Sequence, residues 1–368
     1  MIVVDGCFNM RKIVLVWSIL SFLCGAEVQA DETLLVALTE IEQNYIEKTS
    51  PEDLAVVALK SLNKIDKNIQ VANDKSRITL YYNTKIFKNF NKPQQNLVDE
   101  WVSLIDRIIS AYSQISDKVM LKDYEITDVM IKSIVNSLDE DSKYHTAFDL
   151  VEETAFERKK YFSKRIIGDI LYVRMLGFSD DVSTQFADAL KENENAKGMI
   201  IDLRGNSGGS LNVVMKIGNM VLDGGVMFES DGRDKSMNLL YAAEEKDVFD
   251  DKPIVVMVDA NTASSAEILV GVLREQSRAK LIGTTTYGKS TSQKVIKLPN
   301  DSVLMLTNAR LSLPSGRAFS KIGIKPDYCL NGDSGFDADK KSENCRKEDR
   351  MMRDEDIEAA VKAIKMQI

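Results

Sequence analysis

Residues 198–209 read Gly-Met-Ile-Ile-Asp-Leu-Arg-Gly-Asn-Ser-Gly-Gly, and this stretch gives the clearest indication of the fold. Its apolar start predicts a short strand that is buried on both faces, as strands of parallel sheets are. The glycines that follow predict a sharp turn. Beyond the turn, residues 213–221 have apolar side chains at helical spacing. The stretch is therefore predicted to form a strand, a turn and a helix.

The same alternation continues on both sides of this stretch. It predicts strands at residues 170–175, 253–258 and 281–282, helices at residues 182–193 and 264–276, and a hairpin of residues 293–298 and 303–307. Alternating strands and helices are typical of an α/β core. We expect this core to occupy residues 161–330.

The segments around the core have other patterns. Residues 31–160 have apolar side chains at intervals of three and four, which predicts a helical N-terminal domain. Ser50, followed by Pro51 and two acidic residues, predicts the start of one of its helices. Residues 331–368 are expected to form a C-terminal extension that ends in a helix.

The first thirty residues predict a secretory signal peptide. Arg11 and Lys12 precede the apolar residues 13–24, and Val28-Gln29-Ala30 offers the small residues of a cleavage site. The apolar run is short for a bilayer, so an uncleaved anchor is the weaker interpretation. We expect a periplasmic or secreted protein without a stable membrane span after cleavage.

Composition limits the possible partners. The chain has 368 residues, of which 44% are hydrophobic and 28% charged, as in globular proteins. Acidic residues outnumber basic ones by 56 to 48, and the net charge of -8 should repel a phosphate backbone. We therefore expect no nucleic-acid partner.

Two cysteines follow the predicted core. Cleavage after Ala30 would leave Cys329 and Cys345 in a compartment where disulfides persist. They could form one bridge across a polar, turn-rich segment, or remain two unpaired thiols.

The chain has one histidine, His145, and this limits the possible mechanisms. No cluster of His, Cys, Asp or Glu has the spacing of a metal site, so we expect no metal and no other cofactor. A Ser-His-Asp triad would require the region around His145 to fold over the core. A lysine whose pKa is lowered by burial is the other general base available for hydrolysis.

Two segments of the core could supply a nucleophile and such a lysine. Residues 261–268 place Ser264 among small residues at a predicted helix start, and residues 287–293 place Lys289 on a glycine-containing loop. Each segment alone is also ordinary, because a serine at a helix start is usually a cap and Gly-Lys-Ser is usually a turn.

Together with residues 202–209, these segments resemble the carboxy-terminal processing peptidases, the tail-specific protease family of S41-type Ser-Lys endopeptidases. That family shows D-L-R-G-N-x-G-G, then S-A-S-A-S-E-I, then G-K-x-x-x-Q, which correspond here to residues 202–209, 262–268 and 288–293. Residues 137–144 and 323–327 look like its S-L-D-P-H-S-x-Y and G-I-x-P-D segments. The resemblance covers about residues 125–330 and implies a ClpP/crotonase-like catalytic core.

The resemblance also implies roles for individual residues. Ser264 would be the nucleophile, Lys289 the general base and Gln293 the residue that orients the lysine. The backbone N–H of Ser265 and that of Gly208 or Gly209 would form the oxyanion hole, and Ser265 is a second candidate nucleophile. The implied function is a serine endopeptidase that cleaves unfolded or C-terminal polypeptide segments through an acyl-enzyme.

Departures from the family pattern leave other functions open. The family's PDZ domain, which has about ninety residues as small domains do, would lie where only residues 146–165 intervene, so we predict that it is missing. Glu140 and Asp141 replace the proline and histidine of S-L-D-P-H-S-x-Y, and we expect both to lie away from the chemistry. A catalytically silent binding or scaffold protein is the alternative function. An enzyme acting on acyl-CoA would rest on architecture alone.

Overall fold

The computed structural model describes residues 32–116, 123–149, 161–244, 246–317, 319–331 and 345–367. The predicted signal peptide lies outside these residues. The chain divides into two compact units, which we describe one at a time. The first holds the chain up to Thr39 and residues 49–137 and 298–300; the second holds residues 40–48, 138–297 and 301–368. None of the helices in the described ranges has both the length and the apolar character of a membrane span.

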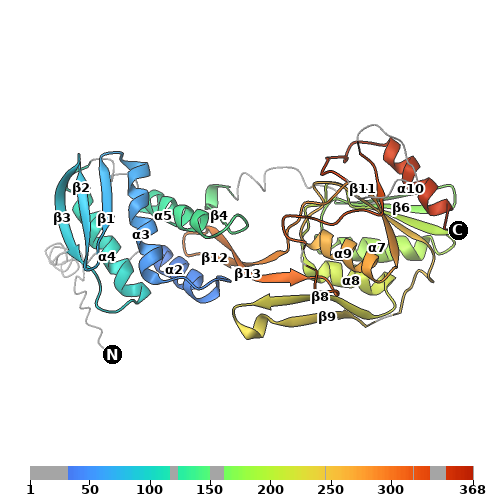
Figure 1. The fold of residues 1–368 in the computed structure, drawn as a ribbon, viewed down its shortest axis with the longest axis horizontal. Helices are drawn as coiled ribbons and strands as arrows, with labels where there is room; N and C mark the ends of the chain where they lie inside the picture. The colour runs from blue at the N-terminus through green and yellow to red at the C-terminus, as the bar shows by residue number, and fades with distance from the viewer. Residues whose placement is uncertain are drawn as a thin grey trace, which may run out of the picture. The chain divides into compact units, whose positions relative to one another are not determined.

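The first unit combines helices with a small sheet (Figure 1). Its helices are α3 (Pro51–Ile65), α4 (Val98–Tyr112), most of α5 (Asp123–Leu138) and the start of α2 (Glu32–Asn44). Helix α3 begins as predicted, because Ser50 Oγ accepts a hydrogen bond from the Asp53 backbone N–H at 3.1 Å. Helix α4 buries Trp101 and the leucine and isoleucines of the same face.

The sheet of the first unit was not predicted. It is antiparallel, in the order β1 (Ile69–Asn73), β2 (Arg77–Tyr82) and β3 (Lys85–Asn91). Asn83 and Thr84 connect β2 to β3, and their φ angles of 49° and 67° are those of a tight hairpin turn. The strands carry many polar residues, so the hydrophobic pattern alone did not reveal them. The two units interleave along the chain, because residues 40–48 belong to the second unit and residues 298–300 to the first.

The second unit contains the predicted α/β core. Its main sheet has the order β14-β11-β10-β7-β6-β5, in which β5 pairs with β6 antiparallel and the other neighbours are parallel. The strands are β5 (Phe162–Ile167), β6 (Ile170–Met175), β7 (Gly198–Asp202), β10 (Ile254–Val258), β11 (Ala279–Gly283) and β14 (Tyr328–Cys329). Strand β7 is buried along its whole length, as its apolar sequence predicts.

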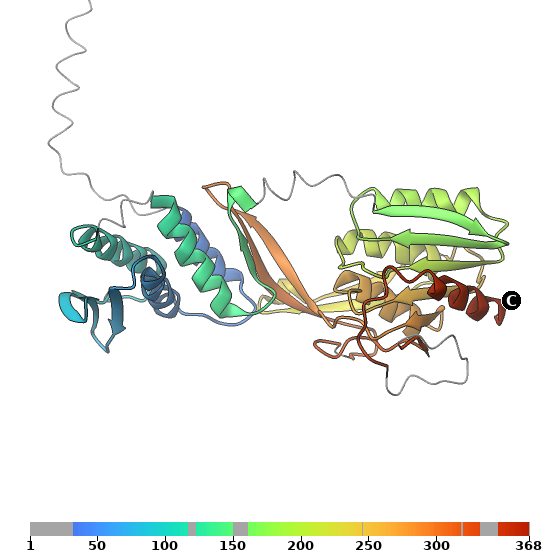
Figure 2. The same ribbon diagram turned by 90° about the horizontal axis from the view of Figure 1, so that it is seen from above.

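Helices cover both faces of this sheet (Figure 2). Helices α7 (Val182–Glu192), α8 (Leu211–Val221) and α9 (Ser265–Glu275) share one apolar core with alternate strand residues such as Leu171, Met199 and Val256. Helix α10 (Glu355–Lys365) packs on the opposite face against Tyr172, Ile200 and Met257. The described end of the C-terminal segment is thus the third layer of the core and not a separate extension.

A second sheet completes this unit. Strands β12 (Thr291–Lys297), β13 (Val303–Ser312), β8 (Gly225–Gly232) and β9 (Leu239–Ala243) follow one another in space, with the 3-10 turn η2 (Lys235–Met237) between β8 and β9, and β4 (Lys143–His145) also pairs with β13. The β12–β13 hairpin was predicted, whereas β8 and β9 were not. Cys329 and Cys345 form a disulfide with Cα atoms 5.7 Å apart, which joins the end of the main sheet to the C-terminal segment.

Candidate active site

Ser264 lies at the sharp turn between β10 and α9. Its φ of 58° and ψ of -125° are unusual for a residue with a side chain. Such a conformation costs on the order of 1–3 kcal/mol and persists only where the surrounding structure imposes it. Ser264 is half-buried, between the small residues Ala263 and Ser265. A strained strand-to-helix turn that presents a serine is the geometry of a nucleophile elbow.

The glycine turn after β7 packs directly against Ser264. A Cβ added at Gly208 would lie 3.0 Å from the Cβ of Ser264, and Gly208 has a φ of 107°. Ser265 Oγ donates a hydrogen bond to the carbonyl of Gly209 at 3.1 Å. Glycine is therefore required at position 208 by both conformation and space, and the predicted residues 208, 209, 264 and 265 are brought together.

The backbone N–H groups at this junction differ in their partners. The N–H of Gly208 donates to Asn206 Oδ1 at 2.8 Å, whereas its carbonyl accepts from the Phe178 N–H at 2.9 Å. The peptide bond is trans, so the N–H of Gly209 points away from Phe178. Within the described ranges, the N–H groups of Gly209 and Ser265 have no acceptor.

Lys289 lies on the loop between β11 and β12. Gly288 shapes this loop with a φ of 96°, and a Cβ there would come within 2.8 Å of the Gly323 backbone nitrogen. Lys289 is half-buried, and its amine has no hydrogen-bond or ion-pair partner among the residues that the structure describes. Within the described residues, no hydrogen bond joins the Lys289 amine to the Ser264 hydroxyl or to Gln293.

Glu267 connects the serine turn to the lysine loop. One carboxylate oxygen accepts from the backbone N–H groups of Ser264 at 3.0 Å and Lys289 at 2.8 Å. The other accepts from the Gly288 N–H at 2.8 Å and from the Thr286 hydroxyl. Burial raises the pKa of Glu267, and the four donors oppose this rise. The sequence marked Glu267 only as part of a motif, because the backbone groups that it binds leave no pattern in the sequence.

Gln293 lies on β12 next to an irregularity in the pairing with β13, where it faces Thr307. Its amide nitrogen donates to Thr291 Oγ1 at 3.0 Å, and Thr291 donates in turn to Asp141 Oδ2 at 2.5 Å. We expected Glu140 and Asp141 to lie away from the site. Two hydrogen bonds connect Asp141 to Gln293 through Thr291, and within the described residues none joins Asp141 to Ser264 or Lys289.

His145 lies elsewhere on the same sheet. It pairs with Val303 at the far end of β13, four residues from Thr307, the partner of Gln293. At roughly 3.3 Å per residue, this separation is about 13 Å along the strand. Within the described residues, no hydrogen bond joins His145 to Ser264, and a Ser-His-Asp triad is not supported by this pairing.

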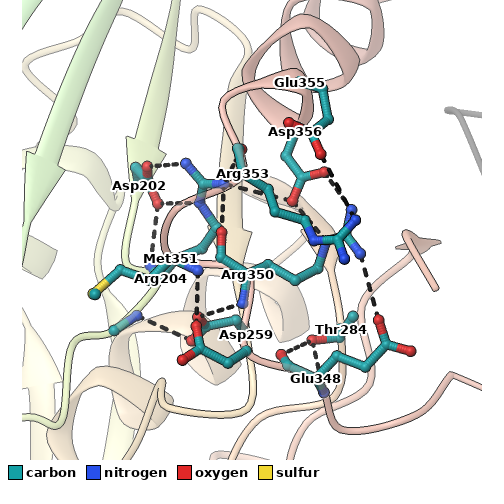
Figure 3. A network of polar contacts seen from close by, with 12 residues as sticks. Asp202, Arg204, Asp259, Thr284, Glu348, Arg350, Met351, Arg353, Glu355 and Asp356 are labelled. Carbon is teal, nitrogen blue, oxygen red and sulfur yellow. Dashed lines mark hydrogen bonds and ion pairs between the residues drawn. The ribbon is translucent and has the colours of Figure 1, made fainter. Parts of the chain in front are cut away.

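The C-terminal segment is connected to the serine turn and the glycine turn by a network of polar contacts (Figure 3). Asp259 Oδ1 accepts from the backbone N–H groups of Gly205 at 3.0 Å and Thr262 at 3.1 Å, and Asp259 Oδ2 accepts from the Arg350 N–H at 3.1 Å. The Arg350 guanidinium in turn forms two hydrogen bonds of 2.6 Å with Asp356. One carboxylate thus ties the two turns to a segment about ninety residues further along the chain.

Arg204 extends this network beneath the glycine turn. Its guanidinium makes a two-point contact with Asp202, at 2.9 and 2.7 Å, and donates to the carbonyls of Arg350 at 2.9 Å and Arg353 at 2.7 Å. Burial alone would lower the pKa of Arg204, but the hydrogen bonds and the charge of Asp202 outweigh this effect and raise it. The Asp-Leu-Arg motif therefore anchors the C-terminal segment. Within the described residues, no group of three or more His, Cys, Asp or Glu could hold a metal ion.

Comparison with known proteins relates this site to peptidases. The family model "Peptidase family S41" matches residues 169–330. A carboxy-terminal-processing protease of Bartonella bacilliformis is 34% identical over 172 residues, which are 45% of this chain and 40% of that protein. The carboxy-terminal processing protease CtpA of Bacillus subtilis is 36% identical over 157 residues, which are 42% of this chain and 33% of that protein.

A solved structure resembles a larger part of the chain. It is that of a lipoprotein from Streptococcus agalactiae, with a TM-score of 0.50 and 18% identity, over 77% of this chain and 93% of that one. This likeness shows the fold alone. The similarity covers 40% and 33% of the two relatives' lengths, and the range of the family model includes Ser264, Lys289 and Gln293.

Proposed function

We propose that this chain, whose residues 169–330 match the model of peptidase family S41, is a serine endopeptidase in which Ser264 is the nucleophile and Lys289 the general base. One observation carries the assignment of these two residues. The buried Glu267 binds the backbone N–H of Ser264 and that of Lys289 through the same oxygen atom. The serine and the lysine are thus fixed to a common point, although 25 positions separate them.

The chemistry follows from these positions. The Lys289 amine takes the proton of the Ser264 hydroxyl while Ser264 Oγ attacks the scissile carbonyl, and it then gives this proton to the leaving amine. Water then hydrolyses the acyl-enzyme: Lys289 takes a proton from the attacking water and gives it to Ser264 Oγ as the acyl group leaves. The amine and the hydroxyl are not hydrogen-bonded in the structure, and such bonds often tighten only when substrate is bound.

The oxyanion hole can be assigned more narrowly than from the sequence. Ser265 and Gly209 have N–H groups without acceptors in the described part of the chain, whereas the N–H of Gly208 is already bound to Asn206. We therefore assign the oxyanion donors to Ser265 and Gly209. Each donor would stabilise the transition state by about 3 kcal/mol.

The substrate is proposed by analogy with the two relatives, and its location from the predicted signal peptide. The two bacterial relatives are described as carboxy-terminal processing proteases. We propose unfolded or C-terminal polypeptide segments as substrates, in the periplasm or outside the cell, where the predicted signal peptide would direct the chain. The disulfide between Cys329 and Cys345 is consistent with such a compartment.

The test uses an unfolded protein such as casein. Ser264→Ala and Lys289→Ala should each abolish cleavage and leave the thermal unfolding curve unchanged. Ser179→Ala, which removes a half-buried serine before α7, and Lys297→Ala, which removes an exposed lysine on β12, are matched controls that should keep full activity. Cleavage by Ser264→Ala at the wild-type rate would contradict the proposal, and a wild-type protein that cleaves nothing would favour the binding or scaffold function.

A further inference from the structure

The hydrogen bonds around Gln293 have a defined direction. An ionised Asp141 can only accept, so the single hydroxyl hydrogen of Thr291 points to Asp141 Oδ2. Thr291 Oγ1 can then only accept from Gln293, and it accepts from the amide nitrogen. The amide oxygen of Gln293 therefore faces away from Thr291. This free oxygen is the atom that could accept a hydrogen bond from a lysine amine.

Asp141 is itself held in place. The backbone N–H groups of Asp141 and Ser142 donate to Asp139 Oδ1 at 2.7 and 2.6 Å, which fixes the turn. Ser142 Oγ accepts from the Thr307 N–H at 3.1 Å, and Thr307 is the residue that pairs with Gln293. The turn at residues 139–142 therefore lies at a fixed position beside Gln293.

We propose that Thr291 and Asp141 are positioning residues that set the orientation of the Gln293 amide, so that its oxygen and not its nitrogen is presented to Lys289. This inference rests on the proposed function. Without the chain of hydrogen bonds, the two ends of the amide would be nearly equivalent in shape. In the flipped orientation an N–H group would donate to the nitrogen lone pair with which Lys289 has to take the proton of Ser264. The residue at position 141 then acts on catalysis through Gln293 and touches no substrate.

Steady-state kinetics on casein-derived peptides test this proposal. Thr291→Val keeps the shape of the side chain but breaks both hydrogen bonds, and should lower kcat about tenfold, the effect of losing roughly one hydrogen bond. KM should be unchanged, and the melting temperature should fall modestly because two hydrogen bonds are lost. Thr291→Ser keeps the hydroxyl and should restore most of kcat. Ser292→Ala on the same strand, whose hydroxyl binds Asn308, is the matched control and should behave as wild type.

A double variant separates positioning from a general structural role. In a Gln293→Ala background, Thr291→Val should have no further effect on kcat, because the residue that it positions is gone. Independent, multiplicative effects of the two changes would overturn the proposal, as would wild-type kcat in Thr291→Val. If Thr291→Val does not fold, Asp141→Ala provides the same test, since it removes the acceptor of the Thr291 hydroxyl and leaves that hydroxyl able to donate to Gln293; unchanged kcat there would also overturn the proposal.

The proposed function and this inference can fail separately. An active Ser264→Ala would refute the function. An inactive Ser264→Ala together with a fully active Thr291→Val would refute only the positioning role.

Discussion

Replacement of Glu267 by glutamine tests how the candidate site is held together. The substitution keeps the size of the side chain but replaces one acceptor oxygen by an NH₂ group. In the less costly orientation, the oxygen continues to accept from the Ser264 and Lys289 N–H groups, and the NH₂ group faces the Gly288 N–H and the Thr286 hydroxyl. The opposite orientation would direct two N–H donors at the NH₂ group.

The cost follows from the hydrogen bonds. A hydrogen bond to a charged group contributes about 1.5–3 kcal/mol and one to a neutral group about 0.5–1.5 kcal/mol. Glu267→Gln loses the bond from Gly288 and weakens those from Ser264 and Lys289, so we expect a loss of about 4 kcal/mol in the free energy of unfolding. A displacement of about 1 Å between nucleophile and base would further lower kcat by about 100-fold.

Urea unfolding measures the first effect and peptide cleavage the second. Glu275→Gln is the matched control, because Glu275 lies on the same helix, is exposed, and among the described residues binds only Ser315. We expect that control to change stability by no more than about 0.5 kcal/mol. If Glu267→Gln is as stable as Glu275→Gln and retains its kcat, Glu267 does not hold the two loops together.

Three further predictions concern stability. Asp356→Ala removes the two-point partner of Arg350, which is 2% exposed, and should lower the free energy of unfolding in urea by about 3–5 kcal/mol; a loss below 1 kcal/mol would contradict this. Replacing Cys329 and Cys345 by alanine opens a loop of 16 residues, which should cost about 3 kcal/mol and abolish the effect of reductant on unfolding. Burial would raise the pKa of Asp139, but hydrogen bonds to its carboxylate outweigh burial and lower it below 3.8, so its contribution to stability is complete above that pH and is lost as the pH falls further. Melting temperatures should therefore show Asp139→Asn to be less stable than wild type at pH 7, with a difference that narrows below pH 3.8; a constant difference would contradict this assignment.

The sequence predicted the segments of the core well because their signals are local. Strand β7 is apolar at every buried position, and the glycine turn after it follows from residue types with special φ angles. The positions around Ser264 and Lys289 were identified from motifs on the same elements. The hairpin turn at Asn83 and Thr84 was also a local signal, but the polar strands beside it hid the hydrophobic alternation.

What could not be predicted are contacts between distant segments. Arg204 binds the carbonyl of Arg353 across 149 positions, and Thr291 binds Asp141 across 150. In the first contact the acceptor is a backbone carbonyl, which every residue has, so it leaves no pattern in the sequence. For the same reason the role of the C-terminal segment in supporting the site became evident only from the structure.

The carboxylates that hold this site mostly bind backbone N–H groups, and this gives an uneven tolerance to substitution. Asp259 binds the N–H groups of Gly205 and Thr262, and Glu267 binds those of Ser264 and Lys289. The donor of such a bond survives any substitution except proline, whereas the acceptor is lost whenever the carboxylate is replaced. When Asp259 or Glu267 is replaced, activity should therefore be lost because the loops are displaced. When Ser264 or Lys289 is replaced, activity should be lost because a reacting group is missing, although the fold is unchanged.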